Sequence, residues 1–442
     1  MMNTRKPPIT IKARWDHHQV PVGKNTSRGL LLEIEAGRFE ELNQQERPAI
    51  NIALVIDRSG SMSNGAMQAA IEAAVGVSEQ LNRHDRLSVI SYDDRVDVLL
   101  DGVAMNRDGR QQAELAIRSL RARSMTDLAG GWLQGARCVA NAMEQHGFKS
   151  GHVILLSDGL ANVGETDPEQ LATLSGNLAE RNVTTTCVGI GTNYSLLQMG
   201  AIAEAGQGEL HQSSEPTEII EVLMGELGEQ TQIVARNFSI HLKGMEMHRA
   251  RQLTRYRKMP VNGRREYFLG NLVGGQSRRL AFLVDFPAYD HADTRQFTCT
   301  ATWLDAETAI HEQRIAETFE IEFVLPENFD KQARDKEAAQ TIADIWMARQ
   351  GYDAMMFNER GQYADAVDAF DKEDQAFSHM VDELQGAKEM LSRRQNVREA
   401  SSAHWDGISK KEAMTLARKR MRSKPDYRQR MESADWSEQT PK

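Results

Sequence analysis

Cysteine is scarce in this sequence of 442 residues, which contains only three of them. Cys138, Cys187 and Cys299 lie far apart, each within an apolar stretch, and no two show the close spacing of a zinc or redox motif. This scarcity excludes a disulfide framework, and isolated thiols in apolar stretches are typical of small buried residues in a reducing compartment. We therefore expect three buried cysteines without disulfide partners.

Long apolar runs and a basic excess are also missing. No uncharged apolar stretch reaches the roughly 20 residues that a membrane-spanning helix requires, and the N-terminal stretch lacks the apolar segment of a secretory signal. The formal net charge is -10, whereas nucleic-acid-binding proteins usually carry an excess of Lys and Arg. These features predict a cytoplasmic protein with no membrane partner, and they disfavour nucleic acid as a partner.

Short apolar runs alternate with amphipathic helical patterns between residues 49 and 234. The first run, Ile50–Ile56, is almost continuously apolar, which is typical of a strand buried on both faces of a parallel sheet. Similar runs follow at Val153–Leu156 and Val183–Ile190, with helical periodicity between them. This alternation predicts an α/β domain with a doubly wound, mostly parallel sheet.

The rest of the chain has a different texture. Strand-like runs separated by turn residues follow residue 234, and similar extended segments precede residue 49. Because the N-terminal segments are too short to fold alone, we expect them to pair with the later strands, so that the α/β domain is inserted into one antiparallel β-sandwich. The predicted division is N-terminal sandwich strands at 1–48, the α/β domain at 49–234, the sandwich at 235–325, a helical hairpin region at 326–392, and a polar, basic tail at 393–442, expected to be solvated or disordered.

Five polar residues stand at positions where a parallel sheet places its ligands. Asp57, Ser59 and Ser61 follow the first strand as Asp-Arg-Ser-Gly-Ser, and Asp158 follows the strand at Val153–Leu156. Thr126 lies just before a predicted helix. Ligands of doubly wound sheets bind beyond the carboxyl ends of the strands, so these side chains are candidates for one site.

The motif and its two distant additions resemble the metal-ion-dependent adhesion site of von Willebrand factor type A (VWA) domains, which have a Rossmann-like fold. The resemblance implies that Asp57, Ser59, Ser61, Thr126 and Asp158 surround one cation. Hydroxyl and carboxylate oxygens suit a hard dication such as Mg²⁺, which prefers about six oxygen ligands; Mn²⁺ or Ca²⁺ are alternatives. We expect Gly60 to let the loop turn tightly enough to direct both serines inward.

The resemblance also implies a function. A site of this family keeps an open coordination position and binds an Asp or Glu of a partner protein, so we expect a metal-dependent adaptor or regulator and not an enzyme. The whole chain is similar to inter-alpha-trypsin-inhibitor heavy-chain-like proteins and bacterial chloride-channel-homologue proteins with VWA domains. Bacterial relatives suggest a kinase, phosphatase or ATPase as the partner.

A metal-dependent hydrolase is the alternative function. It has weaker support, because the sequence contains no G-x-S-x-G nucleophile motif around Ser59 or Ser61 and no phosphate-binding P-loop motif. A third idea, nucleic-acid binding by the basic tail, has weaker support still.

Two other groups of candidate metal ligands are expected not to bind a metal. His17 and His18 form the only histidine pair, and with no third ligand in view we expect both to be exposed. Asp93, Asp94 and Asp127 are expected to be exposed loop carboxylates and not a second cation site.

Overall fold

The computed structural model describes residues 9–37, 49–63, 65–123, 125–191, 193–213, 216–244, 249–261, 264–305, 311–404 and 417. The chain divides into two compact units. The α/β unit consists mainly of residues 39–237, and the sandwich unit consists of residues 1–38, 238–304 and 312–426. The basic part of the predicted tail, from Lys410 onward, lies outside the described residues except for Ala417.

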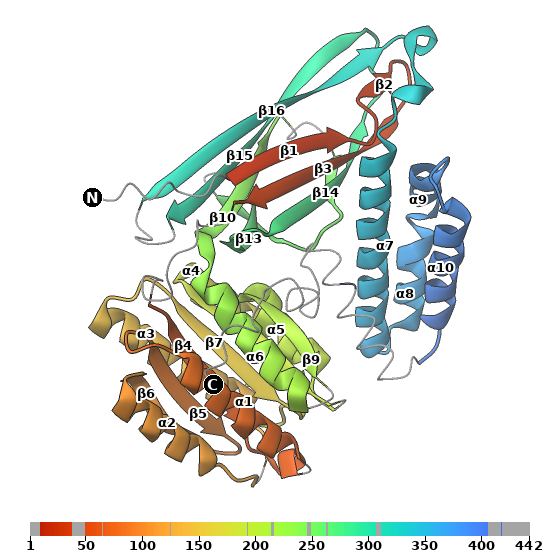
Figure 1. Ribbon diagram of the computed structural model, residues 1–442. Helices are drawn as coiled ribbons and strands as arrows, with labels where there is room; N and C mark the ends of the chain where they lie inside the picture. The colour runs from red at the N-terminus through yellow and green to blue at the C-terminus, as the bar shows by residue number, and fades with distance from the viewer. Residues whose placement is uncertain are drawn as a thin grey trace. The chain divides into compact units, whose positions relative to one another are not determined.

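A six-stranded sheet forms the centre of the α/β unit, with strand order β6-β5-β4-β7-β8-β9 (Figure 1). All neighbouring strands are parallel except β5 and β6, which form an antiparallel hairpin. The prediction of a mostly parallel sheet is confirmed. The strands are β4 (Asn51–Asp57), β5 (Arg86–Tyr92), β6 (Val96–Ala104), β7 (Gly151–Ser157), β8 (Val183–Ile190) and β9 (Gln207–Ser213).

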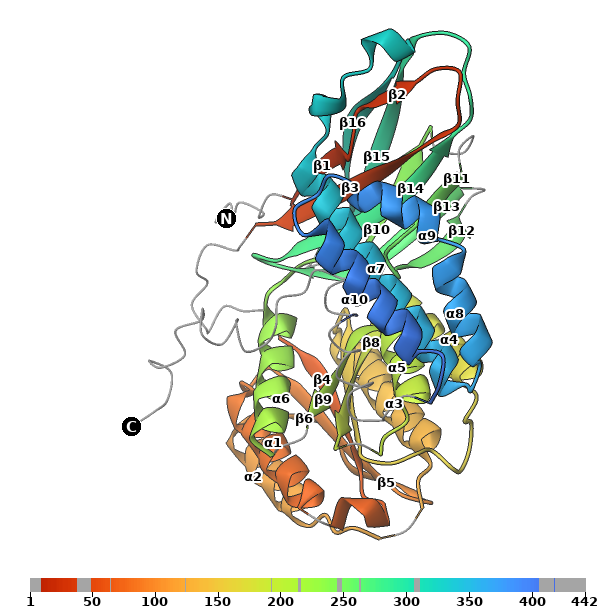
Figure 2. The ribbon, with the colours of Figure 1, turned by 90° about the vertical axis from the view of Figure 1, so that its right-hand side faces the viewer.

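Helices cover both faces of this sheet. The apolar cluster on one face joins α1, α2 and α6 to alternate strand residues such as Leu54 and Leu156, and Figure 2 shows these three helices together. On the other face α3 packs closely, since a Cβ added to its Gly135 would lie 2.3 Å from Cγ2 of Val55. The helices are α1 (Ala66–Gln80), α2 (Arg107–Arg118), α3 (Leu128–His146), α4 (Pro168–Glu180), α5 (Leu196–Ala205) and α6 (Pro216–Thr231).

The sandwich unit contains two largely antiparallel sheets, with strand orders β1-β3-β14-β11 and β12-β13-β10-β15-β16-β2. Strand β3 pairs with β14 from Thr26↔Phe286 to Glu35↔Ser277. The strands that precede the α/β unit therefore share a sheet with strands that follow it, as the sequence predicted. The strands are β1 (Ile9–Trp15), β2 (Gln19–Pro21), β3 (Thr26–Ala36), β10 (Ile233–Lys243), β11 (Arg249–Gln252), β12 (Arg257–Val261), β13 (Arg264–Val273), β14 (Ser277–Phe286), β15 (Asp293–Asp305) and β16 (Glu312–Val324).

Aromatic side chains fill the space between these two sheets. The ring of Trp15 lies 5.8 Å from that of Phe286 in the first sheet. It lies 5.9 Å from the rings of Phe297 and Phe319 in the second sheet. Edge-on and tilted aromatic contacts at these distances are favourable in addition to the apolar area they bury.

Among residues 325–404, four α-helices follow the sandwich strands, which is more than the predicted hairpin. They are α7 (Lys336–Glu359), α8 (Tyr363–Asp371), α9 (Asp374–Val381) and α10 (Ala387–Ala400). The predicted start of the tail, just after Ser392, falls inside α10. Arg394 explains the difference, since its buried guanidinium donates to the side chain of Gln350 and to the backbone carbonyl of Phe370.

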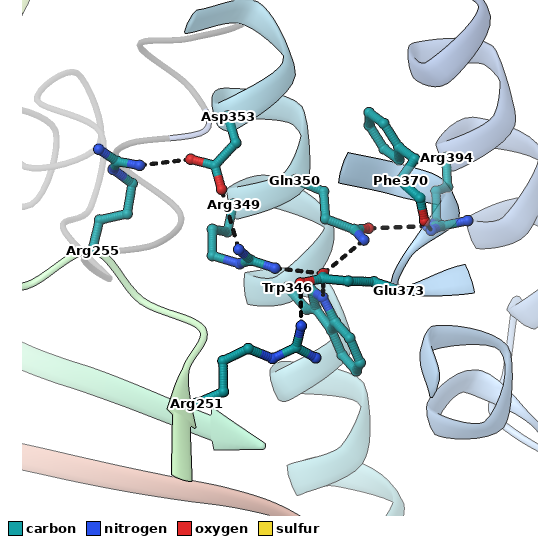
Figure 3. Close-up of polar contacts among 9 residues, drawn as sticks. All are labelled: Arg251, Arg255, Trp346, Arg349, Gln350, Asp353, Phe370, Glu373 and Arg394. Atoms are coloured by element: carbon teal, nitrogen blue, oxygen red, sulfur yellow. Dashed lines mark hydrogen bonds and ion pairs between the residues drawn. The ribbon is translucent and has the colours of Figure 1, made fainter. Parts of the chain in front are cut away.

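A buried carboxylate joins these helices to the sandwich (Figure 3). Glu373 accepts hydrogen bonds from Arg251 on β11 and from Trp346, Arg349 and Gln350 on α7. Burial opposes the charge of Glu373, but Arg349, Trp346 and Arg251 hold its pKa below the usual range. The ionised carboxylate is therefore the form that the fold stabilises.

Candidate metal site at the carboxyl edge of the sheet

Asp57 ends the central strand β4 and is fully buried. One carboxylate oxygen, Oδ1, accepts a hydrogen bond of 2.8 Å from the backbone N–H of Ser59, and Oδ2 accepts one of 2.6 Å from the hydroxyl of Ser157. Burial raises the pKa of Asp57, and its hydrogen bonds to Ser157 and Ser59 oppose this rise. These contacts fix the carboxylate at the end of the strand.

The serine loop (residues 57–61) brings two hydroxyls together beside a second carboxylate. Oγ of Ser59 lies 3.0 Å from Oγ of Ser61. Ser61 in turn donates a hydrogen bond of 2.6 Å to Oδ1 of Asp158. Burial raises the pKa of Asp158, the bond from Ser61 opposes the rise, and the negative charge of Asp57 adds to it. The structure thus places two carboxylates close enough to repel each other.

Thr126 and Gly159 complete the arrangement. A Cβ built on Gly159 would lie 3.4 Å from Oγ of Ser61, 3.7 Å from Oγ1 of Thr126 and 3.9 Å from Oγ of Ser59. All three predicted hydroxyls therefore lie within 4 Å of one point. The structure brings the five predicted side chains to one edge of the sheet, as their sequence positions indicated; that they bind a metal stays a prediction.

The donor set fits a hard dication. Every predicted ligand atom is an oxygen, two of the groups are carboxylates, and such oxygens are the ligands that Mg²⁺ prefers. Asp57, Ser59 and Thr126 are buried, whereas Ser61 is exposed and Asp158 is half-buried. A cation held here would be enclosed on the protein side and accessible on the side of Ser61. The described residues contain no group of three or more His, Cys, Asp or Glu side chains arranged to hold a metal, so this site, with two carboxylates and three hydroxyls, depends on its Ser and Thr oxygens.

A buried ion pair anchors the serine loop through Arg58. Arg58 lies between the predicted ligands in sequence, yet its guanidinium contacts Asp93, with Nε 3.1 Å from Oδ2, and Asp97, with Nη2 2.6 Å from Oδ2. The expectation that Asp93 is exposed is wrong, because its side chain is fully buried against Arg58. Asp94 is exposed as expected, and half-buried Asp127 caps α3 by accepting a 2.9 Å hydrogen bond from the N–H of Gly130.

The histidine pair lies in the sandwich unit, and the prediction that both histidines are exposed is confirmed for one of them. His18 is exposed, but His17 is buried and stacks on Phe329 with ring centroids 4.7 Å apart. Its Nε2 lies 2.9 Å from the backbone carbonyl oxygen of Asp330. Packing against an aromatic ring therefore explains the burial of His17.

A polar cavity of about 350 Å³ beside α7 and α8 is a second place where a ligand could bind. Its charged side chains bind one another, however. Glu373 contacts Arg251 and Arg349, and Lys372 contacts Asp368. We therefore treat this cavity as part of the internal ion-pair network and not as the functional site.

The buried sulfur atoms follow the sequence prediction. Cys138, Cys187 and Cys299 are buried, and none forms a disulfide. Burial raises the pKa of Cys138 and of Cys299 to about 12, so both are held as thiols.

Comparison with known proteins supports the fold and the family. Residues 51–223 match the family model of the von Willebrand factor type A domain, and we assign the α/β unit to this family. The uncharacterized protein sll0103 of Synechocystis sp. is 29% identical over 48% of this chain and 48% of its own length. The human inter-alpha-trypsin inhibitor heavy chain H3 is 30% identical over 35% of this chain and 18% of its own length. The matches thus span less than half of these relatives.

The likeness of fold extends beyond the VWA domain. The solved structure of a von Willebrand factor type A protein from Catenulispora acidiphila has a TM-score of 0.64 and 17% identity. The match covers 95% of this chain and 98% of that one, so it includes the antiparallel sheets and the helical region. Within the described part of the chain, no helix is both long enough and apolar enough to cross a membrane.

Proposed function

We propose that this chain is a metal-dependent protein-binding adaptor or regulator, and that Mg²⁺ bound by Asp57, Ser59, Ser61, Thr126 and Asp158 receives an Asp or Glu of a partner protein. The observation that carries the proposal is the convergence of three hydroxyls on the point beside Gly159, next to two mutually repelling carboxylates. A cation relieves this repulsion, and an all-oxygen set is suited to a hard dication.

The partner's chemistry follows from charge and access. Two of the five predicted ligands are carboxylates, the other three are neutral hydroxyls, and Ser61 is exposed. A bound dication would supply an incompletely neutralised positive charge at a position that an external carboxylate can reach. A protein that presents Asp or Glu meets this requirement; a kinase, a phosphatase and an ATPase are the candidates.

A binding role fits the site better than hydrolysis. Water activation by a metal also requires a positioned general base. Asp57 and Asp158 are both assigned to the cation, and each already accepts a hydrogen bond from a serine hydroxyl. We therefore propose that the domain holds its ligand without chemical conversion.

The test measures metal binding and partner binding separately. Calorimetric titration with MgCl₂ should show uptake by the wild type and its loss in Asp158→Asn, with a change at exposed Asp108 on α2, Asp108→Asn, as the matched control. Affinity purification with Mg²⁺ should retain a partner that chelator or Asp158→Asn releases. Absence of Mg²⁺ and Mn²⁺ uptake at millimolar concentrations would overturn the proposal. Metal-stimulated hydrolysis of ester or phosphate substrates, lost in Asp158→Asn, would favour a hydrolase.

A further inference from the structure

Two large apolar side chains are exposed beside the candidate metal site. Among the described residues, Met125 is 54% exposed and Leu160 is 62% exposed. Met125 directly precedes the predicted ligand Thr126, and Leu160 follows the predicted ligand Asp158 by two positions. Single exposed apolar residues are common on protein surfaces. Two of them on adjacent loops, however, can form a contact surface.

Hydrogen bonds join the two loops that carry Met125 and Leu160. The threonine loop (residues 125–127) and the aspartate loop (residues 158–164) lie against each other. The carbonyl oxygen of Thr126 accepts hydrogen bonds from the N–H groups of Asn162, at 3.2 Å, and Val163, at 3.3 Å. The amide oxygen of Asn162 accepts a bond of 3.1 Å from the N–H of Thr126. Met125 and Leu160 therefore project from two joined loops that also carry two of the five predicted ligands.

Met125 and Leu160 each have a buried neighbour in the sequence. Thr126, next to Met125, is buried, and so is Ala161, next to Leu160. The N–H of Ala161 donates a 3.3 Å hydrogen bond to the side chain of Gln198 on α5. The exposed side chains of Met125 and Leu160 therefore each stand next to a buried residue.

We propose that Met125 and Leu160 form an apolar rim around the metal site and select a partner segment whose metal-binding Asp or Glu is flanked by apolar side chains. The inference rests on the proposed function and adds the sequence preference of the partner. A peptide segment fits because it extends to either side of its carboxylate, so it can contact both loops at once. The cation attracts the carboxylate, and the apolar flanks bury the side chains of Met125 and Leu160.

The size of the effect follows from apolar burial. Burying one large aliphatic side chain contributes enough free energy to change affinity by about tenfold or more. Replacing either Met125 or Leu160 by Ser should therefore weaken binding of an apolar-flanked acidic segment by about tenfold. Neither side chain is a predicted ligand, so Mg²⁺ uptake should be unchanged.

A peptide library tests the inference on the full chain. The library displays a fixed central Glu with three random residues on each side, and peptides bound in Mg²⁺ are eluted with EDTA. We expect the wild type to enrich Leu, Ile, Met and Phe next to the Glu. The double variant Met125→Ser/Leu160→Ser should lose this enrichment, whereas the control Leu115→Ser, which alters an exposed leucine on α2, should keep it.

The possible failures are distinguishable. EDTA-eluted peptides with no apolar preference, or an enrichment that survives in the double variant, would overturn the apolar rim and leave the proposed function standing. No EDTA-eluted peptides, or equal capture of a matched library with central Gln, would overturn the proposed function itself. Mg²⁺-dependent dimerisation in sedimentation, abolished in the double variant, would instead assign the rim to a second copy of this chain and overturn the proposed partner.

Discussion

The guanidinium of Arg58, in the serine loop, and the carboxylate of Asp93 form a buried ion pair, with Nε 3.1 Å from Oδ2. Backbone bonds extend the connection, because the N–H of Arg58 donates to the carbonyl of Tyr92 and the N–H of Asp127 donates to that of Asp93. Asp93 thus ties the serine loop to the threonine loop. Its pKa is lowered, since bonds from Arg95 and Arg58 outweigh the effect of burial, so the pair is ionised.

Removing Asp93 should destabilise the α/β unit. Breaking one partner of a buried ion pair leaves an uncompensated charge and typically costs about 3–5 kcal/mol. We expect Asp93→Ala to lower the free energy of unfolding by about 3 kcal/mol in urea titrations and to weaken Mg²⁺ uptake. The control Asp97→Ala alters the other carboxylate on Arg58, but Asp97 is 51% exposed, so we expect a loss below about 1 kcal/mol. Equal effects of the two variants would contradict a supporting role for the buried pair.

Magnesium should stabilise the α/β unit. A ligand that binds only the folded state adds about 2.7 kcal/mol when its concentration is 100 times its Kd. Thermal unfolding of the wild type should therefore shift upward with MgCl₂ and return with EDTA, while Asp158→Asn should not respond.

The same variant should behave differently without metal. Because Asp158 and Asp57 repel each other, Asp158→Asn should unfold no earlier than the wild type in EDTA. A large loss of stability in EDTA would show that the carboxylate has a purely structural role.

The sheet and the ligand positions could be predicted because their signals are local. An almost continuous apolar run such as Ile50–Ile56 identifies a buried strand, and the residue after it must lie at the carboxyl edge of the sheet. Helix α2 has no comparable apolar run, since the residues that it buries are Gly109, Ala113 and Ile117. Apolar runs alone therefore do not predict a helix over residues 107–118.

Contacts between distant residues could not be predicted from single positions. Asp93 stands in a hairpin turn, where acidic residues are usually exposed, and its partner Arg58 is 35 residues away. Similarly, the charges of α10 suggest a solvated tail, but Arg394 finds its acceptors on α7 and α8. These pairings depend on how distant segments pack against each other, which no single position in the sequence indicates.

Glu373 should be essential for the stability of the sandwich unit. Its removal would take the shared acceptor from Arg251, Arg349 and Trp346, and Arg349 would keep only its ion pair with Asp353. Removing one partner of a buried ion pair typically costs about 3–5 kcal/mol. We expect Glu373→Ala to lower the urea unfolding midpoint strongly. Asp371→Ala is the control, because it breaks an exposed ion pair with Arg398 and should cost about 1 kcal/mol or less. A midpoint for Glu373→Ala close to that of Asp371→Ala would show that the network does not stabilise the unit.

Two adjacent buried groups should give opposite dependences of stability on pH. Burial lowers the pKa of His17 from 6.5 to about 4, so the unfolded chain binds its proton first and stability falls as the pH drops from about 6.5 to 4. Burial raises the pKa of Asp16 from 3.8 to about 6, so the folded chain binds that proton first and stability rises as the pH drops from about 6 to 3.8. Each shift of about two units corresponds to about 3 kcal/mol, and in the wild type the two largely cancel.

Single variants should separate the two contributions. In His17→Gln, of the two groups only Asp16 remains, so the free energy of unfolding of the sandwich unit should increase as the pH drops from 6.5 to 4. In Asp16→Asn, of the two groups only His17 remains, so the free energy of unfolding should decrease as the pH drops over the same interval. The side-chain amide oxygen introduced by Asp16→Asn can still accept the hydrogen bond that the N–H of Gly29 donates to Asp16. Urea unfolding at half-unit pH steps measures both slopes. Slopes of the same sign in the two variants would contradict the assignment, because other groups would then dominate the titration.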